Sequence, residues 1–216
     1  MSATGSSASA SGSSSTPPAA ATESLPLFPL PLVLFPRART QLRIFESRYL
    51  AMTRECSARG TGFGVVHFSP ADDNKPARHA AIGTEALIED FSTLDDGLLG
   101  LEVRGYRRFR IRSTRARDDG LIIGEVEWLP SEPRQQVRPE HAVLQNVLRE
   151  LLQHQAFADI IEADPDDASA LGMALASVLP LETANAQELL AVTDPHDRLR
   201  ALCTLLEQAP EDKPDD

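Results

Sequence analysis

Arginine is the residue type that most clearly suggests a chemical role in this sequence. Seven arginines lie between residues 104 and 117, within a predicted strand. Guanidinium groups bind carboxylates and phosphates through paired hydrogen bonds, and they stack on aromatic rings. Strand alternation places Arg108, Arg110 and Arg112 on one face, with Tyr106 nearer the turn. This strand is the strongest basic feature of the chain and its first candidate for binding a partner.

Two interpretations of the arginine-rich strand are open. In the first, the strand faces solvent and its arginines pair with carboxylates on neighbouring strands, namely Glu85, Glu89, Glu102, Glu125 and Glu127. In the second, the strand docks a partner, because arginine and tyrosine are favoured at interfaces. The candidate partner-binding residues are then Arg104, Tyr106, Arg108, Arg110, Phe35 and Trp128.

Aromatic residues are otherwise expected inside the fold. A small antiparallel barrel needs its few aromatic side chains in the core, so we expect core packing for Phe28, Phe35, Phe45, Tyr49 and Trp128.

Histidine, cysteine and aspartate are not spaced as metal ligands. The five histidines never fall in an H-E-x-x-H spacing, and Cys56 and Cys203 lack a CxxC partner. The run from Asp164 to Asp167 lacks the central glycine and closing glutamate of a calcium loop. We expect free thiols, no metal and no other cofactor.

The charge of the chain is divided unevenly. The net charge is −11, yet residues 1–131 hold 15 basic and 15 acidic side chains, whereas residues 132–216 hold 6 and 17. An acidic half of this kind repels phosphate backbones. The charge distribution therefore disfavours nucleic acid as a partner.

Residues 1–23 are typical of a disordered, Ser/Ala-rich tail. They contain neither the basic start and apolar stretch of a secretory signal nor the arginines of a transit peptide. The chain also has no apolar run long enough to cross a membrane. These features predict a cytoplasmic protein without a membrane-spanning segment.

Residues 24–131 have the pattern of a β-rich unit. Apolar and polar residues alternate in segments 62–68, 80–91, 97–105, 106–117 and 120–129, with Asp-Gly turns at 95–97 and 118–120. The proline-rich stretch 25–36 suits a first or edge strand. Phe45, Tyr49, Met52 and Cys56 fall at helical spacing before Gly60. We predict an antiparallel β-barrel with one short helix.

Residues 132–209 have the composition of a helical bundle, and residues 210–216 form an acidic tail. Two stripes of apolar residues repeat at helical spacing and predict two helices. The first is Val143, Val147, Leu148, Leu151 and Leu152, and the second is Leu171, Leu175, Val178 and Leu179. Asn185 and Asp194 are the predicted N-caps of two further helices. The overall fold class predicted is α+β. A binding groove, if present, would lie between the barrel and the helices, lined by aliphatic side chains with arginines at its rim.

The motifs resemble those of a known family. LPLFPLPLVLFPRARTQLRIFESRYLAM, residues 25–52, is similar to the opening signature of the Lon protease N-terminal, substrate-binding domain. FGVV at 63–66, IGTEALIEDF at 82–91 and VRGYRRFRI at 103–111 continue the resemblance, and LPLETANAQELLAVTDPHDRLRAL at 179–202 resembles the family's last two helices. The resemblance covers roughly residues 24–208. It implies a PUA-like β-barrel followed by a helical bundle, and a role in recognising unfolded or tagged proteins.

The chain departs from the full-length protease of that family. It has no G-x-x-x-x-G-K-[ST] phosphate loop, and its only lysines are Lys75, in a polar loop, and Lys213, in the acidic tail. No catalytic residue can be named, so we expect no enzyme activity. The favoured hypothesis is a binding module for exposed protein segments, or an adaptor in protein quality control. An alternative is RNA or nucleotide binding through the arginine-rich strand, and a third is peptidase activity by family association only. The oligomeric state is left open.

Overall fold

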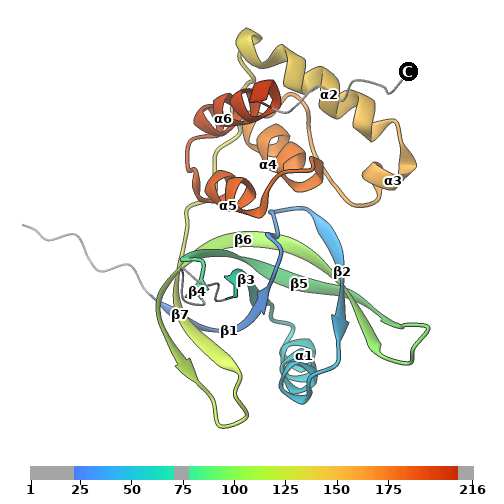
Figure 1. The fold of residues 1–216 in the computed structure, drawn as a ribbon, viewed down its shortest axis with the longest axis vertical. Helices are drawn as coiled ribbons and strands as arrows, with labels where there is room; N and C mark the ends of the chain where they lie inside the picture. The colour runs from blue at the N-terminus through green and yellow to red at the C-terminus, as the bar shows by residue number, and fades with distance from the viewer. Residues whose placement is uncertain (1–21, 71–77, 209–216) are drawn as a thin grey trace, which may run out of the picture.

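The computed structural model describes residues 22–70 and 78–208. Of the predicted tails, residues 1–21 and 210–216 lie outside the described residues, as does residue 209 of the predicted bundle. Glu23, assigned to the first tail, begins the first strand. A layer of strands lies below a layer of helices (Figure 1). The strands are β1 (Glu23–Leu30), β2 (Arg39–Ile44), β3 (Phe63–Ser69), β4 (Arg78–His79), β5 (Ile82–Thr93), β6 (Leu99–Ala116) and β7 (Ile122–Trp128).

The strands pair in a ring. The hydrogen-bonded order is β1, β7, β6, β5 and β3, and β1 also pairs with β3. All of these pairs are antiparallel except β1 with β3, which run parallel from Leu27 opposite Gly64 to Leu30 opposite His67. The predicted antiparallel meander is confirmed for β5, β6 and β7, but the prediction that all strands pair antiparallel is wrong. The chain between β1 and β3 contains β2 and a helix, which is long enough for the crossover that a parallel pair requires.

Strand β6 is a single continuous strand, whereas the sequence predicts two strands, one ending at Gly105 and the next beginning at Tyr106. This glycine serves a close approach of backbone and not a turn. A Cβ atom there would lie 2.1 Å from the carbonyl oxygen of Phe35. The Gly105 amide donates to the oxygen of Ala38 at 2.9 Å, and the amide of Arg37 donates to the oxygen of Gly105 at 2.7 Å. The loop after β1 is thereby hydrogen-bonded directly to the middle of β6.

Helix α1 (Ser47–Arg59) has the predicted buried stripe, except at its first position. Tyr49, Met52 and Cys56 are buried, and Gly60 closes the helix in a left-handed conformation with φ of 64°. Phe45 is 65% exposed, so its predicted core position is wrong. The residue precedes the helix and follows β2, whose alternating buried positions end at Ile44.

The helical layer contains η1 (Pro139–His141), α2 (Ala142–Leu152), α3 (Gln155–Ala158), α4 (Ala168–Val178), α5 (Thr183–Ala191) and α6 (Pro195–Gln208). Asp194 caps α6 as predicted, accepting from the amides of His196 and Asp197. The predicted cap at Asn185 is wrong, because α5 already begins at Thr183. None of the helices in the described part of the chain has the length and apolar character to cross a membrane.

Burial in α2 differs from the predicted stripe. Its buried residues are Leu144 and Leu148, whereas Val143 is 60% exposed. The predicted Leu148 is buried and Val147, Leu151 and Leu152 pack against the core, so the prediction is wrong only for Val143, whose place is taken by Leu144. In α4 the predicted Leu171 and Leu175 are both fully buried.

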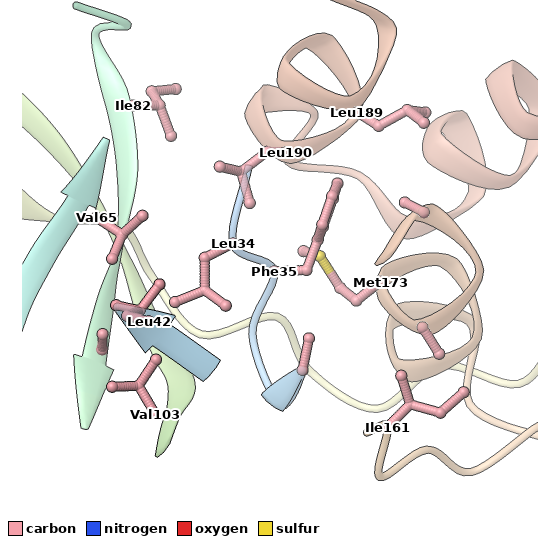
Figure 2. Packing of buried hydrophobic residues seen from close by; sticks show 14 of the residues in the cluster. Leu34, Phe35, Leu42, Val65, Ile82, Val103, Ile161, Met173, Leu189 and Leu190 are labelled. Carbon is pink, nitrogen blue, oxygen red and sulfur yellow. The ribbon is translucent and has the colours of Figure 1, made fainter. Parts of the chain in front are cut away.

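One hydrophobic core joins the two layers. Leu34, Leu42 and Val103 on the strand side belong to the same buried cluster as Met173 and Leu190 on the helical side. Figure 2 shows the two adjacent residues of the β1–β2 loop turning apart, with Leu34 toward the sheet and Phe35 toward Met173. Because the loop contributes side chains to both layers, it positions the helices over β6.

Candidate functional site

A pocket of about 270 Å³ lies between β6, the β1–β2 loop, the segment after β7 and helix α4. Its apolar lining comes from Leu129, Ile161, Ala170, Met173 and Ala174. Arg37, Arg104, Tyr106 and Arg107 also line it. The sequence placed a groove with aliphatic walls and a rim of arginines between strands and helices. The pocket has that position and contains those residue types, but Glu132, Glu162, Asp167 and three serines also line it.

The floor of the pocket contains a buried ion-pair network. Arg108 is only 5% exposed, and one of its terminal nitrogens donates to the carbonyl oxygens of Leu190 and Val192, both at 2.7 Å. Its other terminal nitrogen donates to the carboxylate of Glu132. Arg198, fully buried in α6, donates to both oxygens of the same carboxylate. Two guanidinium groups therefore share one buried carboxylate.

The network is almost completely hydrogen-bonded. Glu132 also accepts from the hydroxyl of Ser169, and Arg198 donates to the oxygens of Leu189 and Val192. Desolvation favours the neutral acid, but the hydrogen bonds from Arg198 and Ser169 and the charges of Arg198 and Arg108 together outweigh it and hold the pKa of Glu132 below its ordinary value. Burial lowers the pKa of Arg108. These contacts connect β6, the segment after β7, α4 and α6, so the network fixes the shape of the pocket.

The solvent-facing interpretation of the arginine-rich strand is wrong for Arg108. Alternation does put Arg108 on the same outward face of β6 as Tyr106 and Arg110, both of which are exposed. The helical layer covers this face at Arg108, whose guanidinium donates to Leu190 near the end of α5 and to Val192 directly after it. Arg108 consequently supports the pocket from below and is not available to phosphate groups of RNA.

Three of the other arginines of this strand behave as the predicted cross-strand partners. Arg104 pairs with Glu89 at 2.8 Å and Arg107 with Glu85 at 2.8 Å, and Arg112 pairs with Glu127, which confirms three of the predicted carboxylates as partners. The guanidinium of Arg107 also lies 3.7 Å from the ring centroid of Trp128.

The structure separates the six candidate partner-binding residues into two groups. Arg104, Tyr106 and Arg108 line the pocket. The remaining three do not. Phe35 is 1% exposed and lies in the core, and Trp128 is partly buried with the guanidinium of Arg107 over its ring. Arg110 is exposed on β6 outside the pocket.

Several residues of the site were not predicted as such. Glu132, Ile161 and Met173 come from segments whose sequence carries no local signal for a pocket. Arg198 had a signal, because it sits inside an apolar helical stripe with Leu199 and Leu202. A charged residue in such a stripe is buried only when it is paired. No group of three or more histidine, cysteine, aspartate or glutamate side chains among residues 22–70 and 78–208 is placed to hold a metal ion.

Comparison with known proteins places this chain in a family. Residues 24–208 match the ATP-dependent protease La (LON) substrate-binding domain. The crystal structure of a Lon N-terminal domain protein from Xanthomonas campestris is similar, with a TM-score of 0.70 and 42% identity, covering 87% of this chain and 99% of that one. The N-terminal domain of the Mycobacterium avium complex Lon protease has the same fold, with a TM-score of 0.62 and 21% identity, covering 87% and 100%.

A full-length relative matches over a limited part of its length. Lon protease 2 of Herpetosiphon aurantiacus is 28% identical over 214 residues, covering 88% of this chain and 24% of that protein. The chain thus spans about a quarter of the length of this curated relative. The family match extends over most of the chain and includes all of the described strands, apart from Glu23 at the start of β1. The chain therefore belongs to the Lon substrate-binding domain family.

Proposed function

We propose that this chain is a non-catalytic binding module that holds exposed segments of other polypeptides in the pocket between β6 and α4. The observation that carries the proposal is the pocket lining, in which aliphatic side chains lie beside arginines and an exposed tyrosine. Ligand pockets in proteins combine a mostly apolar lining with a few polar groups that orient the ligand.

The size of the pocket favours side chains over a cofactor. Its volume of about 270 Å³ is just below the roughly 300 to 1,000 Å³ of sites for drug-sized ligands. It therefore suits one or two apolar side chains of an extended segment. Tyr106, 54% exposed at the edge, offers a large and rigid contact surface to the rest of such a segment.

The absence of enzyme activity is part of the proposal. The family match is to the substrate-binding part of the Lon proteases. No phosphate loop is found in the sequence, and its two lysines lie in polar or acidic surroundings. We propose that the module acts in the cytoplasm, either by holding unfolded proteins or as an adaptor to a separate protease.

We also infer a PUA-like barrel for the strand layer. The ring of pairings from β1 through β7, β6, β5 and β3 back to β1 supports it, because closure of this kind removes sheet edges. The proposed units are 24–131 for this barrel and 132–209 for the helical bundle.

Photo-cross-linking tests the proposed function. A benzoylphenylalanine at position 106 should cross-link to a reduced and alkylated, permanently unfolded polypeptide. The matched control carries the same probe at position 91, because Phe91 is also an exposed strand aromatic, at 45%, but lies outside the pocket. Equal cross-linking at both positions, or none at 106, would show that the pocket does not hold polypeptide segments.

A further inference from the structure

Arg37 occupies the least favourable backbone conformation at the pocket. It is the one residue other than glycine with positive φ in the described part of the chain, at 68°. The amide of Ala38 donates to the oxygen of Phe35 at 3.2 Å, which makes Phe35–Ala38 a turn with Pro36 and Arg37 at its centre. The third position of such a turn, when φ is positive, favours glycine or asparagine. Arginine there is strained, and strain of this kind concentrates where a side chain has a function.

The strained backbone is held firmly on both sides. The amide of Arg37 donates to the oxygen of Gly105 in β6, and the amide of Arg39 donates to the oxygen of Ile160 at 2.8 Å. Ala38 forms an isolated bridge with Ile161, which lines the pocket. The arginine is consequently presented at a defined place beside the apolar lining.

Among the arginines that line the pocket, Arg37 alone has no carboxylate partner in the described part of the chain. Arg107 is paired with Glu85, and the buried Arg108 shares the carboxylate of Glu132 with Arg198. Arg104 shares Glu89 with Arg39 and approaches Glu162 at 3.7 Å. Asp167 accepts backbone amides of Gln135 and Ser169. Arg37 is exposed and has no ion pair among residues 22–70 and 78–208.

We propose that Arg37 selects an acidic side chain in the bound segment, next to the apolar residue that enters the pocket. The inference rests on the proposed function and names the class of segment: an extended polypeptide with a glutamate or aspartate beside a bulky apolar residue. Charge complementarity supports this occupant, because a guanidinium without an ion-pair partner binds a carboxylate through two parallel hydrogen bonds between opposite charges, which is stronger than a bond to a neutral carbonyl. A protein with a net charge of −11 otherwise repels such segments, so a local cation is needed to accept them.

The test uses two short fluorescent peptides that differ only in a glutamate or a glutamine beside a leucine. Fluorescence anisotropy measures their dissociation constants with the complete chain. We expect the glutamate peptide to bind about tenfold more tightly, with a preference that weakens as salt is added. Arg37→Gly should abolish the preference and raise the melting temperature, because glycine relieves the positive φ. Arg37→Lys should retain part of the preference.

The matched control is Arg110→Gln, which removes an exposed arginine of β6 that lies outside the pocket and has no ion pair within the described ranges. This variant should keep the preference for glutamate. If both peptides bind equally to the unaltered chain, the inference is wrong while the proposed function stands. If neither peptide nor any unfolded polypeptide binds, the proposed function fails too. Self-association of the chain that Arg37→Gly prevents would identify a second copy as the occupant and overturn the inference.

Discussion

Removing the negative charge of Glu132 should destabilise the fold severely. The Glu132→Gln substitution keeps the size of the side chain but leaves Arg108 and Arg198 facing each other without a counter-charge. Their side chains are 4% and 0% exposed, so water cannot replace the carboxylate. Breaking a buried ion pair by removing one partner costs about 3 to 5 kcal/mol. A chain of this length has a total stability of roughly 10 to 15 kcal/mol at most, so the loss is a large fraction.

Urea unfolding followed by circular dichroism measures this loss. The midpoint should fall by about 1 to 2 M without a change of slope. Glu55→Gln is the control, because the ion pair of Glu55 with Arg117 has side chains 43% and 31% exposed. Exposed pairs contribute about 0 to 1 kcal/mol. If the Glu132→Gln variant is as stable as the Glu55→Gln variant, the buried network does not hold the strand and helical layers together, and the reasoning is refuted.

Three other features of the fold give testable outcomes. Gly105→Ala should destabilise by about 1 to 3 kcal/mol in thermal unfolding, because its Cβ would meet the oxygen of Phe35; an unchanged melting temperature would contradict that close approach. Phe35→Ala should cost about 3 to 5 kcal/mol in urea unfolding, and a loss below about 1 kcal/mol would show that the loop does not join the layers. Burial lowers the pKa of His141, so the unfolded state binds the proton first and stability should fall as pH drops through the ordinary value of 6.5. His141→Gln should flatten that part of the curve.

Local patterns in the sequence were sufficient for most of the elements. Tyr49, Met52 and Cys56 repeat at helical spacing, and Gly60 follows them, so α1 and its end could be predicted. Asp194 before a proline predicted the start of α6 for the same reason, since a cap depends on its own residue and the next few amides. Such signals involve neighbours in the chain and require no knowledge of the rest of the fold.

The site could be predicted only in part. The arginines of β6 and their outward face follow from alternation, and Arg104 and Tyr106 do line the pocket. The prediction failed where a distant segment decides the surroundings. Phe45 was expected inside, but the helix begins after it; Gly105 was expected to separate two strands, but the β1–β2 loop crosses β6 there.

The sequence by itself therefore determined most of the strands, the cap of α6, the family motifs and the positions of the charges along the chain. The tertiary structure decided which charges are buried. Arg108 and Glu132 are 24 residues apart in the chain, and Glu132 and Arg198 are 66 apart. Alternation gives the direction of each side chain from its strand but not what covers it, and the helical layer covers β6 at Arg108 while leaving Arg110 exposed. The difference between a buried support and a free binding residue is thus a property of packing between distant segments.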